Sequence, residues 1–257
     1  MYNIPSFFIA AVLLISMTTA MWLGIATGKR WQVNENSESK SQANAVQGSL
    51  LGLLALLLGF TFSLALGRFD ERSAEVVKEA NAIGTAWLRT DFVSEARRDA
   101  AKDLLRRYAE VRVEGTDISA ARSQEREQHV DRAETLFGQL WSIAADEALD
   151  PGGPAAVAFA TSLNDVSDAL SSRDAAIERH VPEPVLYLLF GTFVVLGAVI
   201  GFTYAISGVR PGIPIYAMMM LIVVLVFLII DLDRPRRGLI AVDQSKLLST
   251  VEMMKSQ

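Results

Sequence analysis

Residues 47–91 pass, without a single proline, from the apolar composition of a membrane span to the charged composition of a helix in water. The first part of this stretch is apolar enough to cross a bilayer, and the second part is charged and amphipathic. A continuous helix of this length would reach about 67 Å at 1.5 Å per residue, roughly twice the hydrocarbon thickness of a membrane. Such a helix would carry structure from the membrane into an aqueous domain.

One face of this helix is built mainly from small and polar residues. At 100° per residue, one stripe contains Ser49, Gly52, Leu56, Phe60, Ser63, Gly67 and Asp70. The largely opposite stripe contains Leu50, Leu54, Leu58, Thr61 and Ala65. Two interpretations are open. Spacing alone favours the first, in which small residues such as Gly52, Gly59 and Ser63 allow a neighbouring helix to approach closely. In the second, the stripe lines a water-filled path, and Leu56 and Phe60 form an apolar constriction.

The apolar residues, 51% of the chain, gather in blocks that predict an all-α membrane protein with four transmembrane helices. The predicted spans are residues 5–26, 48–66, 185–206 and 213–230. A polar loop at residues 29–46 is expected to precede the second span. The second span is expected to continue as a helix to about residue 90. A cleaved signal peptide is the alternative for the first span, which the lack of a preceding basic residue disfavours. Helical periodicity predicts a helical domain at residues 68–182, and residues 231–257 form a C-terminal segment.

The distribution of basic residues predicts the orientation in the membrane. Four spans place both termini and residues 68–182 on the same side. Near the span ends, that side carries nine basic residues: Arg68, Arg72, Lys78, Arg173, Arg179, Arg234, Arg236, Arg237 and Lys246. The other side carries four: Lys29, Arg30, Lys40 and Arg210. The positive-inside rule therefore makes the termini and the helical domain cytoplasmic.

Composition disfavours several classes of function. Without cysteine, and with only His129 and His180, a metal centre is not expected, and we expect no cofactor. His180 precedes Pro182 and is more simply an interfacial residue than a proton switch. No constellation of an activated nucleophile or a metal pair indicates an enzyme. No dense basic run indicates a nucleic-acid partner.

Four motifs give the chain a resemblance to a known family: LGF at residues 58–60, GRFDER at 67–72, EANAIGT at 79–85 and DLDRPRRG at 231–238. With the order of the four spans, they resemble the bestrophin-like bacterial membrane proteins, which are relatives of the bestrophin ion channels. The resemblance covers nearly the whole chain. It implies an oligomeric ion channel, pentameric by resemblance only, in a bacterial inner membrane, whose partners are the lipid bilayer, its own copies and inorganic ions.

Because the second span lines the bestrophin pore, the resemblance makes Leu56 and Phe60 the neck and favours the pore interpretation of the stripe. Gly52 stands where the family neck has a bulky residue, so the constriction would be shorter or wider. Animal bestrophins bind calcium through an acidic cluster after the fourth span, but here only Asp231 and Asp233 remain, followed by three arginines. Two carboxylates supply too few oxygen ligands for calcium, which prefers six or more. Calcium gating through this segment is therefore not expected.

Charges at the span ends support two further predictions. Asp231 is expected to pair with Arg68 or Arg72, because an unpaired charge near hydrocarbon is costly; the alternative is that these side chains simply face headgroups and water. Asp70, at the cytoplasmic exit, would form an acidic ring in an oligomer. Residues 68–182 hold 15 Lys and Arg against 22 Asp and Glu, a net charge of −7. Both features favour passage of cations, although Arg68 and Arg72 could offset the charge of the acidic ring.

The alternative function is that of a non-conducting membrane-anchored sensor or scaffold, whose cytoplasmic helices bind a partner.

Overall fold

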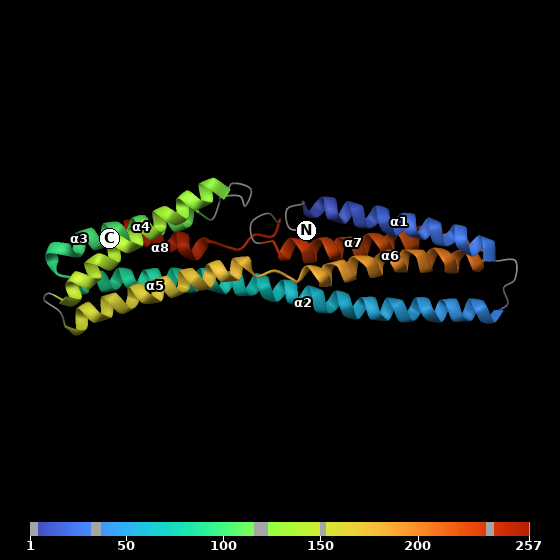
Figure 1. Ribbon diagram of the computed structural model, residues 1–257, viewed down its shortest axis with the longest axis horizontal. Coiled ribbons are helices and arrows are strands. Elements are labelled where there is room, and N and C mark those ends of the chain that lie inside the picture. Colours follow the sequence, from blue (N-terminus) through green and yellow to red (C-terminus); the bar gives the residue numbers. More distant parts are fainter. Residues whose placement is uncertain (1–4, 32–36, 116–122, 150–152, 235–238, 257) are drawn as a thin grey trace. The chain divides into compact units, whose positions relative to one another are not determined.

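The computed structural model describes residues 5–31, 37–115, 123–149, 153–234 and 239–256. Every regular element in these ranges is a helix, as the periodicity predicts. In chain order the elements are α1 (Ser6–Trp31), α2 (Ser37–Arg89), the short 3-10 helix η2 (Thr90–Phe92), α3 (Glu95–Glu114), α4 (Ser123–Leu149), α5 (Pro154–Glu178), α6 (Glu183–Ile206), α7 (Ile213–Leu232) and α8 (Ser245–Lys255) (Figure 1). Within the described ranges, four helices are long and apolar enough to cross a membrane, namely α1, α2, α6 and α7.

The loop predicted at residues 29–46 is wrong at both ends. Helix α1 continues to Trp31, and α2 already begins at Ser37. No proline or glycine lies between Ser37 and Gly48, and alanines at 43 and 45 favour helix, so nothing in the sequence stops α2 from starting early. Helix α2 is therefore 53 residues long and continues through Gly67 and Gly84 without a break.

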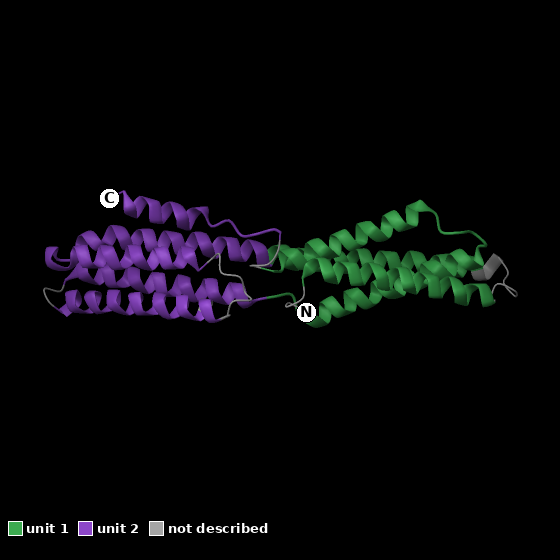
Figure 2. Cartoon of the chain, turned by 90° about the horizontal axis from the view of Figure 1, so that it is seen from above, with its two compact units in different colours: residues 1–67, 180–234 green, residues 68–179, 235–257 purple. Residues whose placement is uncertain are grey.

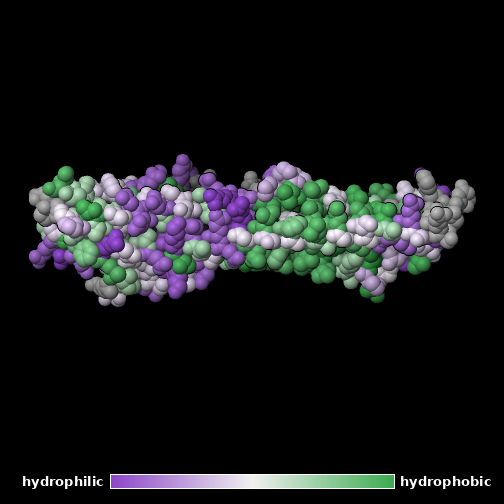
Figure 3. Space-filling model, turned by 90° about the horizontal axis from the view of Figure 1, so that it is seen from below, coloured by the Kyte–Doolittle hydropathy of each residue, from purple (hydrophilic) through white to green (hydrophobic). Residues whose placement is uncertain are grey.

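The chain divides into two compact units (Figure 2). Unit 1 comprises residues 1–67 and 180–234, and unit 2 comprises residues 68–179 and 235–257. On the face drawn in Figure 3, apolar residues form a broad surface over unit 1, whereas hydrophilic residues are frequent over unit 2. The predicted boundary at residue 182 falls close to the observed division, but the C-terminal residues join unit 2.

In unit 1, the core joins α1, α6 and α7 through buried side chains that include Leu13, Met17, Phe193 and Leu196. The closest approach is between α1 and α6, and it depends on glycine. A Cβ atom at Gly197 or Gly201 would collide with the backbone of Met17 or Met21, respectively. These two glycines form a GxxxG motif, which allows two helix backbones to pack directly against each other in a membrane.

In unit 2, helices α2, α3, α4, α5 and α8 share an apolar core that includes Ile83, Tyr108, Leu140, Phe159 and Leu247. The Tyr108 and Phe137 rings are 6.1 Å apart between centroids. Helix α8 contributes three buried side chains, those of Leu247, Val251 and Met254. The C-terminal segment is thus part of the unit 2 core.

Unit 2 also buries charged side chains. Glu147 on α4 accepts hydrogen bonds from the hydroxyl and the backbone N–H of Ser94, and it pairs with Arg97 at 2.8 Å. Burial alone would raise the pKa of Glu147, but the hydrogen bonds from Ser94 and the charge of Arg97 outweigh it and lower this pKa. Ser94 occupies the N-cap position of α3, yet its hydroxyl is used for Glu147 and does not cap the helix.

Candidate functional site

The predicted stripe of α2 is uncovered in the protomer along its whole length. All seven of its residues, from Ser49 to Asp70, are exposed, and the large side chains of Leu56 and Phe60 are 61% and 63% exposed. On the opposite face, Leu54, Thr61 and Ala65 are buried. The division of α2 into two faces therefore agrees with the sequence prediction, whereas lining of a pore remains a prediction.

The glycines on this stripe and beside it, Gly52, Gly67 and Gly59, approach no neighbouring helix closely within the protomer. A Cβ atom at Gly52, Gly59 or Gly67 would meet nothing within 4 Å. Only 17% of the most apolar 18-residue segment of α2 is buried, compared with 44% of the corresponding segment of α1. Among the described residues, close helix approach occurs through glycines of α1 and α6. The uncovered face of α2 is thus available to lipid, to water or to a second protomer.

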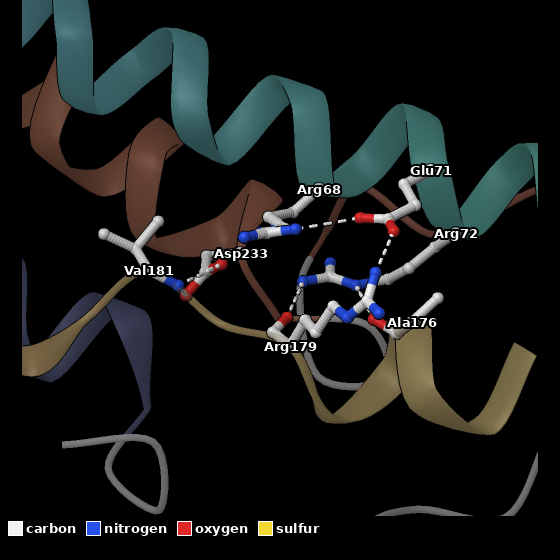
Figure 4. A network of polar contacts seen from close by, with 7 residues as sticks. All are labelled: Arg68, Glu71, Arg72, Ala176, Arg179, Val181 and Asp233. Atoms are coloured by element: carbon white, nitrogen blue, oxygen red, sulfur yellow. Dashed lines mark hydrogen bonds and ion pairs between the residues drawn. The ribbon is translucent and has the colours of Figure 1, made fainter. Parts of the chain in front are cut away.

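At the start of unit 2, α2 is fixed to the end of α5 by a polar network (Figure 4). Glu71 pairs with Arg68 at 2.9 Å and with Arg179. Arg72 is buried, and it donates hydrogen bonds to the carbonyl oxygens of Ala176 at 3.3 Å and Arg179 at 3.2 Å. Arginine suits this position because its planar fork can satisfy several acceptors at once.

Sequence reasoning missed Glu71 as the partner of Arg68. The signal was present, since Arg68 and Glu71 are three residues apart on one helix face. Asp231 is buried in unit 1 with 2% of its surface exposed. Its pairing with Arg68 or Arg72 stays a prediction.

Asp233 has a structural role that the sequence did not reveal. Its buried carboxylate accepts the backbone N–H of Val181 with both oxygens at 3.1 Å. The Nδ1 atom of His180 lies 3.0 Å from the backbone carbonyl oxygen of Asp233. These contacts fix the segment that enters α6 to the end of α7, both in unit 1. In the described ranges, no group of three or more His, Cys, Asp or Glu residues could hold a metal ion. The absence of calcium gating remains an expectation.

Two ion pairs deeper in unit 2 also escaped the sequence analysis. Glu79 on α2 has no exposed surface and pairs with Arg112 of α3 at 2.6 Å and with Arg173 of α5. Burial opposes the charge of Arg112, but the carboxylate of Glu79 outweighs this effect and raises the pKa of Arg112. Glu79 lies between Val76 and Ile83 on the buried face of α2, so an acid within an apolar stripe was the available signal.

The apolar spans and the helical units define an all-helical integral membrane protein. A family model described as a Bestrophin-like domain matches residues 15–247 of this chain. The chain therefore belongs to the bestrophin-like family, and the resemblance carried by the sequence motifs is confirmed. Bestrophins are ion channels and not enzymes. No curated protein and no solved structure matches the chain.

Proposed function

We propose that this protein is a homo-oligomeric ion channel of a bacterial inner membrane, with its pore lined by α2. The observation that carries the proposal is the uncovered stripe Ser49, Gly52, Leu56, Phe60, Ser63 and Gly67 on an apolar helix whose opposite face buries Leu54, Thr61 and Ala65. Five copies, the number that the resemblance implies, would bring five such stripes around one axis.

In this arrangement Leu56 and Phe60 form the narrow apolar part of the pore. Such a constriction gates by dewetting, because water and ions leave a narrow apolar passage unless it widens. Gly52 lies one turn away and widens the path beside it. Asp70 follows at the cytoplasmic exit, where a ring of carboxylates attracts cations. Cations are the proposed permeant ions, and residues 68–182 are proposed to lie in the cytoplasm.

Recording from the purified protein in a planar bilayer under a salt gradient tests this function. We expect discrete current steps that reverse near the cation equilibrium potential. Reversal near the anion potential would keep the channel and contradict the acidic ring. Silence across voltage, pH and added calcium would contradict conduction and would favour a membrane-anchored scaffold instead. Phe60→Ala provides a second test, because removal of a ring from the neck should raise the unitary conductance.

A further inference from the structure

A buried cluster in unit 2 centres on Glu79. Its carboxylate accepts hydrogen bonds from Arg112 Nε at 2.6 Å and from Arg173. Arg173 is itself buried, and its second terminal nitrogen donates to the side-chain oxygen of Gln244 at 3.0 Å. The amide nitrogen of Gln244 then donates to the Val242 carbonyl oxygen at 3.2 Å. The cluster thus joins α2, α3, α5 and the residue that precedes α8.

The positions of these residues along the chain are informative. The chain passes between the two units at three places, after residues 67, 179 and 234. Glu79 follows the first passage on α2, Arg173 precedes the second on α5, and Gln244 follows the third. One cluster within unit 2 therefore gathers all three segments that connect it covalently with unit 1.

Removal of Glu79 and removal of Gln244 would have different effects on the stability of unit 2. Glu79 is fully buried between two guanidinium groups, so its removal would leave two buried cations without their shared carboxylate and would destabilise unit 2. Gln244 is uncharged and makes a single contact with Arg173. Its removal would release the C-terminal segment from the cluster while Glu79, Arg112 and Arg173 stay paired.

We propose that the contact between Arg173 and Gln244 couples the C-terminal segment to α2 and thereby sets the balance between open and closed pore. Gln244 is then a positioning residue that acts through Arg173 and Glu79 on the pore helix. The idea rests on the proposed function, since it assigns a regulatory contact to the proposed pore. Helix α8 stays attached by Leu247, Val251 and Met254 and by the ion pair of Lys255 with Glu110 at 3.2 Å, so the contact can break without unfolding the unit.

The test is Gln244→Leu in the full-length protein, which removes the acceptor for Arg173 and keeps a similar side-chain volume. A hydrogen bond to a charged group is strong enough to change the ratio of open to closed channels about tenfold. The unitary conductance and the reversal potential should not change, because Gln244 does not belong to the proposed pore lining. Gln139→Leu is the matched control, since Gln139 is exposed on α4.

An unchanged open probability in Gln244→Leu would overturn the coupling. Amide hydrogen exchange separates this failure from a failure of the proposed function. If the wild-type protein is silent, the channel proposal and the gating role both fail. The contact itself is still tested, because faster exchange in residues 245–255 of Gln244→Leu supports it and unchanged exchange contradicts it.

Discussion

The two units of this chain hold their helices together in different ways. In unit 1, α1 and α6 approach through glycines, and a methyl group at Gly197 or Gly201 would meet the backbone of α1. In unit 2, buried charges such as Glu79 and Glu147 bridge the helices. Helix α2 passes through both units, yet neither mode of packing covers its exposed stripe. A glycine in an apolar helix can therefore mean close packing, as in α6, or an open surface, as in α2.

The largest expected effect comes from a bulky side chain at the α1 and α6 contact. Gly201→Leu should destabilise unit 1 by about 3 kcal/mol, because neither backbone can move away without disrupting the core. The measurement is thermal unfolding and the yield of monodisperse protein in detergent. Gly191→Leu on the same helix is the control, since a Cβ atom there meets nothing within 4 Å. Equal stability of both variants would contradict the assigned glycine contact.

A second prediction concerns a buried charge of unit 1. Asp231→Asn should lower the stability in detergent by about 2 kcal/mol, the size expected for a hydrogen bond to a charged group. The reason is the predicted pairing of Asp231 with Arg68 or Arg72. Within unit 2, Arg68 contacts Glu71, and Arg72 contacts backbone carbonyl oxygens near the end of α5. Asp168→Asn, at an exposed position, is the control. If stability and assembly in Asp231→Asn match the wild type, the pairing is wrong.

Acid should weaken unit 2 where the buried carboxylate of Glu147 joins α4 to the start of α3. Because the folded-state pKa of Glu147 lies below the ordinary value of 4.5, its stabilisation is complete above pH 4.5 and is lost as the pH falls through the lowered pKa. The loss should be roughly 1–2 kcal/mol. The protection factors of the amides in α3 and α4, which are corrected for the intrinsic effect of pH on exchange, should fall below pH 4.5 more in the wild type than in Glu147→Gln. An equal fall in both proteins would assign the acid sensitivity to other groups.

Much of the fold follows from patterns that a sequence shows directly. Continuous apolar runs locate the four spans, and angular position divides α2 into a buried and an exposed face, because both depend on local periodicity. The Gly197 and Gly201 motif was also visible, but nothing in the sequence says which helix it contacts. The roles of Glu79, Glu147 and Asp233 depend on partners 33 to 94 residues away, so only the folded chain identifies them. The start of α2 was missed because polar residues were interpreted as a loop, although no residue there breaks a helix.

The exposed glycine of α2 should behave in the opposite way to Gly201. Gly52→Leu should leave stability within about 0.5 kcal/mol of the wild type, since its surroundings in the protomer are open. It should reduce the unitary current, because it adds a second bulky ring of side chains beside Leu56 in the proposed pore. Ala55→Leu, exposed on the same helix away from the stripe, is the control. Loss of folding in Gly52→Leu without effect in Ala55→Leu would indicate that this face packs against protein and does not line water.

The smallest expected effect is a change of ion selectivity without a change of fold. Asp70→Asn removes one exposed carboxylate per protomer, so the ratio of cation to anion permeability should fall while stability stays constant. Arg68 already pairs with Glu71, and this reduces its capacity to neutralise Asp70. Reversal potentials under a salt gradient give the ratio, and Asp99→Asn serves as the exposed control on α3. An unchanged ratio would remove the acidic ring as the source of selectivity and would leave the net charge of residues 68–182 as the remaining argument for cations.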